Sequence, residues 1–171
     1  MAFGLTGASP GEARQWSRTP AALAQDYAVI ADNRGAGDVV MLMWLSAATL
    51  PDTPTTKIAR DLIDKYVVLG IVHGHTQKDG AATFDKIAPP AVSDADKKPL
   101  VELDESALAP AMVGMLAMLK AGSGSLLGNL GRGVQWFVYD SGTVRSCARG
   151  GLLVAVESET YTYETPFPGC P

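Results

Sequence analysis

The clearest strand in the sequence lies between Tyr66 and Thr76, where most residues up to Val72 are apolar. Successive side chains of a β-strand point to opposite faces, so the odd-numbered residues of this segment share one face. That face carries three aliphatic residues followed by two histidines, namely Val67, Leu69, Ile71, His73 and His75. The segment therefore predicts a buried strand whose far end becomes polar on one side.

Three further regions have the length and composition of strands. Residues 27–31 and 39–45 are apolar and flank a loop rich in Gly, Asn and Asp at residues 32–38, which predicts a hairpin. Residues 134–139 are mostly aromatic and β-branched, and residues 152–163 alternate with period two. We expect residues 152–163 to form one long strand with one solvent-exposed end.

Helices are predicted where apolar residues recur at intervals of three and four. Residues 55–65 form one such segment, and a short helix is expected at residues 19–25. The longest helix is predicted from Pro110 to Lys120, with a face that would cover a sheet and that consists of Leu108, Met112, Met115 and Leu119. Glycines at 122 and 124 are expected to end this helix and begin a connector that reaches residue 133.

The order of these elements predicts an α+β fold, with a mostly antiparallel sheet covered by two or three helices. Short turns join neighbouring strands, which favours antiparallel pairing. Residues 88–98 contain two prolines and four charged residues, which predicts a solvated loop, and residues 100–103 predict a short strand. We expect one domain over residues 19–171, preceded by a loosely docked arm at residues 1–18.

Composition narrows the class of partner. The chain has 171 residues, of which 47% are hydrophobic and 19% charged, as in globular proteins. Its 14 Lys and Arg against 18 Asp and Glu give a net charge of -4, without a cluster of basic residues, so we do not expect it to bind nucleic acid. No apolar segment reaches the roughly twenty residues that a transmembrane helix needs, and the first ten residues lack the pattern of a signal peptide.

The two cysteines, Cys147 and Cys170, provide the remaining evidence on the compartment. Cys170 lies in a tail rich in Pro and Gly, where a cysteine contributes little as a buried apolar residue. A disulfide with Cys147 explains it better, and such a bond indicates an oxidising compartment. We therefore expect a periplasmic or secreted protein, with a cytoplasmic protein bearing two free thiols as the alternative.

His73 and His75 are the principal candidates for metal ligands. On a strand both imidazoles point to the same side and could bind one divalent metal ion, with Gly74 giving the backbone room to bend. Asp85 is the candidate for a third ligand, because it follows the next turn of the chain. The alternative is that the two histidines are only the polar end of a strand that leaves the core.

The position of Asp85 depends on the turn between the two segments. A three-residue turn at residues 78–80 places His73 opposite Asp85, and the His-His-Asp cluster can then form. A two-residue turn at residues 79–80 places His73 opposite Lys86 instead, and Asp85 points to the other face. The sequence leaves both registers open.

A second group of candidates lies in the period-two segment at residues 152–163. If that segment is one strand, four side chains share a face, and carboxylates beside aromatic rings suit a carbohydrate, a cationic ligand or a peptide. The four residues are Glu157, Glu159, Tyr161 and Tyr163. Packing of aromatic residues across strands explains the tyrosines equally well without any ligand.

These features predict a small exported domain that binds a protein partner or a small ligand without catalysis. The sequence contains no nucleophile elbow and no phosphate-binding loop, and it indicates no cofactor other than a divalent metal ion. One alternative is a metal-dependent enzyme built on His73 and His75. The other is a structural subunit of a homo-oligomer, which would expose a helix face containing Met112 and Met115.

Overall fold

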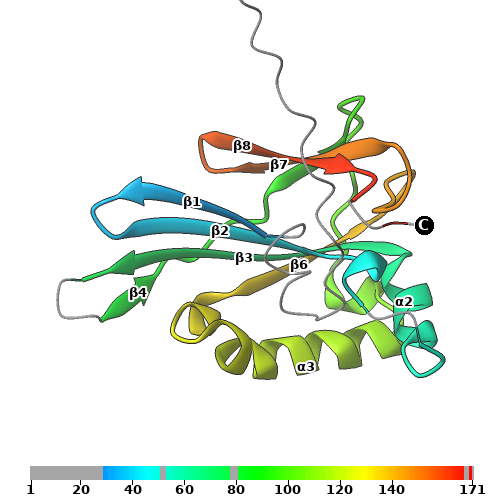
Figure 1. Ribbon diagram of the computed structural model, residues 1–171, viewed down its shortest axis with the longest axis horizontal. Coiled ribbons are helices and arrows are strands. Elements are labelled where there is room, and N and C mark those ends of the chain that lie inside the picture. Colours follow the sequence, from blue (N-terminus) through cyan, green and yellow to red (C-terminus); the bar gives the residue numbers. More distant parts are fainter. Residues whose placement is uncertain (1–28, 51–52, 78–80, 168–169, 171) are drawn as a thin grey trace, which may run out of the picture.

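The computed structural model describes residues 29–50, 53–77, 81–167 and 170. Two antiparallel sheets and two α-helices are arranged in three layers (Figure 1). The helices cover one face of the larger sheet, and the smaller sheet covers its other face. The α+β class with antiparallel pairing is confirmed, although a second sheet takes the place that we expected helices to fill. The predicted arm at residues 1–18 and the helix at 19–25 lie outside the described residues.

The central strand of the larger sheet is the long strand that the sequence predicted between Tyr66 and Thr76. Strand β3 (Tyr66–Thr76) has the predicted bounds, and it pairs on one side with β2 (Asp38–Leu45), which in turn pairs with β1 (Val29–Gly35). On its other side β3 pairs with β6 (Gln135–Asp140) along its first half and with β4 (Ala82–Phe84) near its end. Strand β3 is therefore the centre of the sheet.

The β1–β2 hairpin is confirmed, but its loop is much shorter than predicted. Strand β1 continues to Gly35, so the polar residues Asp32 and Arg34 belong to a strand. Asp38 is the first residue of β2 and pairs with His75 on β3. The turn is tight because Ala36 and Gly37 both have positive φ, of 50° and 86°. The prediction of a loop at residues 32–38 was therefore wrong.

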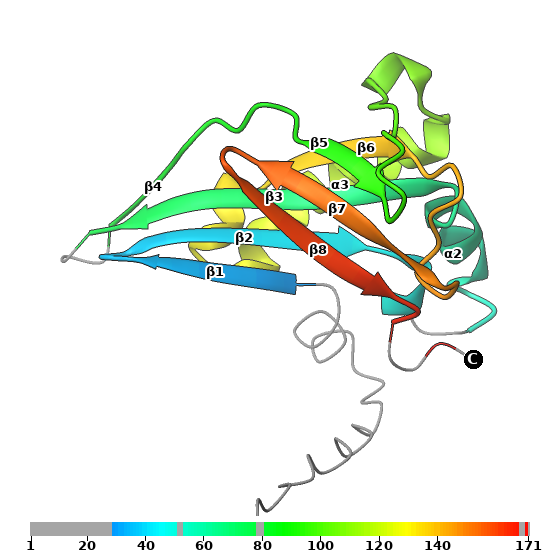
Figure 2. The same ribbon diagram turned by 90° about the horizontal axis from the view of Figure 1, so that it is seen from above.

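The smaller sheet has the order β5-β7-β8, formed by β5 (Ala91–Asp94), β7 (Gly150–Val156) and β8 (Glu159–Thr165). Figure 2 shows β7 and β8 crossing above β2 and β3. The prediction of one long strand at residues 152–163 was wrong, because a turn at residues 157–158 folds it into a hairpin. The two-residue turn changes the phase of the alternation, so that Val154 and Val156 share the inner face with Tyr161 and Tyr163.

Strand β5 lies within the segment that we predicted to be a solvated loop. Val92 is almost fully buried and pairs with Val154 on β7, so the prediction of a solvated loop was wrong for this part of the segment. The expected strand at residues 100–103 is reduced to a single bridge between Glu102 and Tyr139.

Helix α3 (Pro110–Leu127) extends about two turns beyond its predicted end at Lys120. Ser123 lies in this extension and connects it to the sheet: its hydroxyl donates to the carbonyl of Leu119 and accepts from the indole of Trp136 on β6. Gly131 packs directly on the backbone of Ser123, where a Cβ atom would not fit. The glycines at 122 and 124 are thus tolerated inside a helix that tertiary contacts hold.

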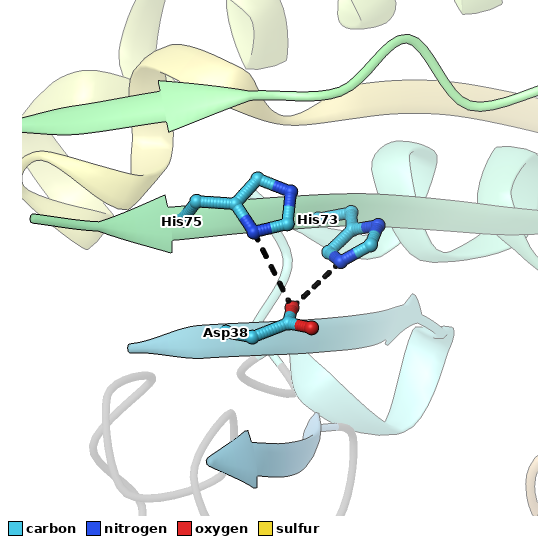
Figure 3. A group of neighbouring side chains, drawn as sticks. All are labelled: Asp38, His73 and His75. Atoms are coloured by element: carbon cyan, nitrogen blue, oxygen red, sulfur yellow. Dashed lines mark hydrogen bonds and ion pairs between the residues drawn. The ribbon is translucent and has the colours of Figure 1, made fainter. Parts of the chain in front are cut away.

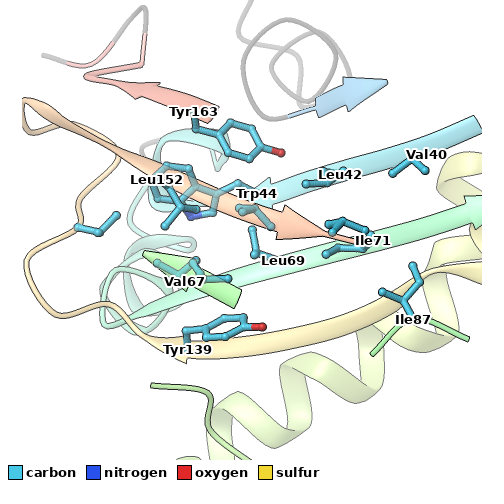
Figure 4. Packing of buried hydrophobic residues seen from close by; sticks show 14 of the residues in the cluster. Val40, Leu42, Trp44, Val67, Leu69, Ile71, Ile87, Tyr139, Leu152 and Tyr163 are labelled. Atoms are coloured by element: carbon cyan, nitrogen blue, oxygen red, sulfur yellow. The ribbon is translucent and has the colours of Figure 1, made fainter. Parts of the chain in front are cut away.

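The hydrophobic core has two parts. The main part lies between the sheets and includes Val40, Leu42, Leu69 and Ile71, with Trp44 packed edge-on against Tyr163 (Figure 4). The second part lies between the larger sheet and α3, where the helix contributes Met112 and Leu116 and the segment just before it contributes Leu108. Met115 and Leu119 are only half-buried. Helix α2 (Lys57–Ile63) contributes the buried Ile63, while Ile58 is exposed.

A disulfide joins Cys147 to Cys170, as the sequence predicted. It ties the chain end to the loop that precedes β7, next to Phe167, whose ring packs on Trp44. Among the described residues, no helix is long and apolar enough to span a membrane.

Candidate metal centre

The centre lies where the inter-sheet face of β3 changes from aliphatic to polar. Ile71 is fully buried in the main core, His73 is 6% exposed, and His75 reaches the surface. The same side of β2 carries Val40, opposite His73, and Asp38, opposite His75. The alternation that builds the core therefore also brings these polar side chains together at its outer end.

The register of β3 and β4 is the one that a three-residue turn predicts. His75 pairs with Thr83 and Gly74 with Phe84, and the backbone N–H of Asp85 donates to the carbonyl of His73 at 3.0 Å. Asp85 therefore lies beside the two histidines, and the alternative register with Lys86 opposite His73 was wrong. The turn at residues 78–80 lies outside the described residues.

Asp38 contacts both imidazoles (Figure 3). Its Oδ1 atom lies 2.7 Å from His73 Nε2 and 3.7 Å from His75 Nδ1. In a tetrahedral site with ligands about 2.1 Å from zinc, donor atoms are about 3.4 Å apart. The two distances lie on either side of that value, so small side-chain rotations would allow one ion to contact all three atoms. One donor atom from each residue lies within 4.8 Å of the other two.

The other nitrogen of each imidazole contacts carboxylates other than that of Asp38. His73 Nδ1 lies 2.8 Å from Glu157 Oε1 and 3.3 Å from Asp85 Oδ2. His75 Nε2 lies 2.9 Å from the same Asp85 oxygen. Histidines that bind metals usually donate their other N–H to a carboxylate or carbonyl, which fixes the orientation of the ring. Both histidines therefore have the polar surroundings that metal ligands need.

A second set of donor atoms is formed by His73, Asp85 and Glu157. This set has one imidazole and two carboxylates, whereas the set with Asp38 has two imidazoles. Zinc and related ions favour imidazole nitrogen over oxygen. The site around Asp38 is therefore the better match, and Asp85 and Glu157 serve it through the outer ring nitrogens.

Arg34 on β1 connects the centre to the smaller sheet. Its Nη1 donates to Glu157 Oε2 at 2.8 Å, and its Nη2 donates to the hydroxyl of Tyr161 at 3.0 Å. The Tyr161 hydroxyl in turn donates to Asp32 at 2.9 Å. The tip of the β7–β8 hairpin is thus held against the larger sheet by a continuous chain of polar contacts.

These contacts shift the pKa values of the groups involved. Burial lowers the pKa of His73, but the hydrogen bonds to Asp38 and Glu157 outweigh it, so the pKa is raised overall. The hydrogen bond from Arg34 holds the pKa of Glu157 below its usual value, and the bond to His75 does the same for Asp85. The contacts with Asp38 and Glu157 therefore favour the protonated form of His73, in which both ring nitrogens can donate.

The structure separates the four residues that the single-strand prediction grouped together. Glu157 lies in the turn of the hairpin and reaches the centre, and Tyr161 reaches it through Arg34. Tyr163 is buried in the main core, where burial raises its pKa. Glu159 is exposed at the start of β8. The four side chains do not form one ligand-binding surface.

Asp38 was missed by the sequence analysis because it was assigned to a loop. The available signal was the pair Gly35 and Gly37, which marks a tight turn and makes Asp38 the first residue of a strand. Glu157 was identified as a candidate, but its approach to His73 depends on contact between the two sheets, over 84 residues of sequence.

Comparisons with protein family models, with curated proteins and with solved structures find no match for this chain.

Proposed function

We propose that this protein binds one divalent transition-metal ion, of the class of zinc, at Asp38, His73 and His75. The observation that carries the proposal is the division of the ring nitrogens: one nitrogen of each histidine faces Asp38 Oδ1, and the other faces an outer carboxylate. Residues that formed only a surface ion-pair cluster would not need this pairing on both rings.

The donor set favours zinc, cobalt, nickel or copper over calcium and magnesium. Calcium and magnesium take mostly oxygen ligands, whereas imidazole nitrogen suits the transition metals. Charge is consistent with a cation: three carboxylates surround the two imidazoles, and Arg34 is the one arginine or lysine that contacts this group among the described residues. An ion bound at His73 Nε2 requires a neutral imidazole and would therefore take the place of any proton between this nitrogen and Asp38.

We propose that binding, rather than catalysis, is the role of the site, in an exported protein. The disulfide supports an oxidising compartment, since such bonds are rare in the cytosol. A metal-dependent enzyme is the second candidate, because three protein ligands leave a coordination position for water, as in catalytic zinc sites. A homo-oligomer built on Met112 and Met115 has less support, because Met112 is fully buried between α3 and the larger sheet.

Isothermal titration with zinc, together with elemental analysis after dialysis, tests the proposal. We expect one equivalent of zinc in the wild type, and a loss of affinity of roughly a hundredfold or more in Asp38→Asn and in His75→Gln, because each removes a ligand. Asp61→Asn is the matched control, since Asp61 is an exposed carboxylate on α2 that pairs with Lys57. Calcium should not compete. Well under one equivalent of zinc, or equal affinity in all variants, would rule out the proposal.

A further inference from the structure

Arg34 occupies an unusual position for a strand residue in a hairpin. Its side chain is only 20% exposed, and it points toward the smaller sheet, where it contacts Glu157 and Tyr161. Its Nε lies 3.6 Å from Asp32. The guanidinium is therefore held by two hydrogen bonds to the β7–β8 hairpin, while its contact with Asp32 on its own strand is an ion pair without a hydrogen bond at Nε.

Glu157 needs such an anchor. Its side chain is 42% exposed, and it lies in a two-residue turn with φ of 55°, so neither packing nor secondary structure fixes its carboxylate. One carboxylate oxygen accepts from Arg34 and the other contacts His73 Nδ1, both at 2.8 Å. Arg34 thus holds the Glu157 carboxylate in the orientation in which its other oxygen faces the imidazole.

We infer that Arg34 is a positioning residue for the metal centre and acts through Glu157. By holding Glu157 on His73 Nδ1, it keeps the proton of the neutral imidazole on that nitrogen and leaves the Nε2 lone pair for the ion. This inference rests on the proposed function, because it assigns a role in the same site.

A second possible ion site shows why the contact between Arg34 and Glu157 is important. His73 Nδ1, Asp85 and Glu157 also form a set of donor atoms close enough for an ion. Without Arg34, the Glu157 carboxylate is free to leave the ring or to become a ligand itself, and His73 loses its preference for presenting Nε2. Arg34 therefore selects the site with two imidazoles over the site with one.

A double-mutant cycle tests whether Arg34 acts through Glu157. Zinc affinity is measured in the wild type, Arg34→Gln, Glu157→Gln and the double variant. We expect Arg34→Gln alone to weaken zinc binding about tenfold, the lower end of the effect of losing an outer-sphere partner, and to have no further effect in the Glu157→Gln background. Arg149→Gln is the control, because Arg149 is an exposed arginine at the other end of β7.

The ring nitrogens of His73 provide a readout that a general loss of structure would not produce. In the zinc-loaded wild type, nitrogen NMR should show the proton of His73 on Nδ1 and that of His75 on Nε2. Arg34→Gln should lose this state at His73 and keep it at His75. Arg34→Lys keeps the charge but cannot reach both Glu157 and Tyr161, so it should restore only part of the affinity, and it replaces Arg34→Gln if that variant does not fold.

The outcomes separate this inference from the proposed function. If the wild type binds zinc and Arg34→Gln weakens it equally in both backgrounds, Arg34 acts by its charge or on the fold, and the inference is wrong. An unchanged affinity in Arg34→Gln would overturn it as well. If the wild type binds no zinc, the proposed function fails first, and the role of Arg34 in it fails too.

Discussion

His73 is the residue on which the centre depends, because it is the only buried member and it contacts carboxylates through both ring nitrogens. A buried imidazolium is favourable here only because Asp38 and Glu157 compensate for the lost hydration. The same contacts that would orient a metal ligand therefore stabilise a charged ring when no metal is bound.

The stability of the metal-free protein should pass through a maximum between about pH 4.5 and 6.5. The pKa of His73 is raised above its usual 6.5, so its contribution is complete below that pH and is lost as the pH rises through the raised pKa. The pKa of Glu157 is lowered from 4.5 by Arg34, so its contribution is present above 4.5 and is lost as the pH falls. Thermal unfolding in EDTA between pH 4 and 9 measures the decrease of stability on both sides of this maximum.

Excess zinc should counteract the loss of stability at alkaline pH, because the ion binds the neutral imidazole. The melting temperature with excess zinc should therefore exceed that in EDTA by more at pH 8 than at pH 6. A curve in EDTA that rises steadily from pH 6.5 to pH 9 would contradict the assignment of His73 as a charged ring between carboxylates.

The sequence predicted the residues of this centre unequally, for physical reasons. His73 and His75 share a face because of local strand geometry, which any strand imposes, and that prediction depended on no distant contact. Asp85 required the register of one turn, which the sequence left open. Asp38 and Glu157 required the pairing of β2 with β3 and the contact between two sheets, which are properties of the tertiary fold.

Among the secondary-structure elements, α3 shows most clearly how packing overrides local preference. Its apolar face was predicted from spacing, but the buried residue near its middle is Leu116, and Met115 is half-exposed. The helix also passes through Gly122 and Gly124, which cost roughly 1 kcal/mol each relative to alanine in a helix interior. Contacts of Ser123 with Trp136 and Gly131 compensate for this cost, and they were not visible in the sequence.

Two substitutions on α3 should differ sharply. Leu116→Asp places a charge in the core between α3 and the sheet and should lower the free energy of unfolding by about 3 kcal/mol or more. Met118→Asp should change it by less than about 0.5 kcal/mol, because Met118 is 70% exposed. Urea denaturation of the two variants and the wild type measures the difference. Equal effects would show that the helix is rotated relative to this packing.

The β7–β8 hairpin shows the opposite case, in which the missed signal was local. Valines occupy the even positions 154 and 156, whereas tyrosines occupy the odd positions 161 and 163, and this change of phase agrees with the two-residue turn, although Leu153 and Ala155 are apolar as well. Glu157 adopts a positive φ there without being glycine, which disfavours most side chains. Its contacts with Arg34 and His73 account for a glutamate at this position.

On the scale of the whole molecule, the two ends of the smaller sheet are fixed to the larger one by different means. The turn of the β7–β8 hairpin is held by the polar contacts of Arg34 and His73. The opposite end is held by Phe167 against Trp44 on β2, and the disulfide of Cys147 and Cys170 joins the segments that flank β7 and β8 next to this contact. The disulfide was predictable because a cysteine in a tail rich in Pro and Gly has little other use, whereas the pairing of the sheets was not.

Reduction of the disulfide should destabilise the protein without abolishing the metal centre. The bond closes a loop with a sequence separation of 23 residues, which corresponds to about 3 kcal/mol in the chain-entropy model. Urea denaturation with and without reductant, and of the Cys147→Ser/Cys170→Ser variant, measures the change. Intact mass after alkylation provides the control, and two labelled thiols without prior reduction would show that the bond does not form.

The most direct test of the central claim is anomalous X-ray diffraction at the zinc edge from crystals grown with zinc and washed. We expect one peak at full occupancy about 2.0–2.2 Å from Asp38 Oδ1, His73 Nε2 and His75 Nδ1, with Glu157 and Asp85 still on the outer ring nitrogens. A peak between His73 Nδ1, Asp85 and Glu157 would place the ion on the other side of the ring. The absence of any peak within reach of His73 would contradict the metal centre itself.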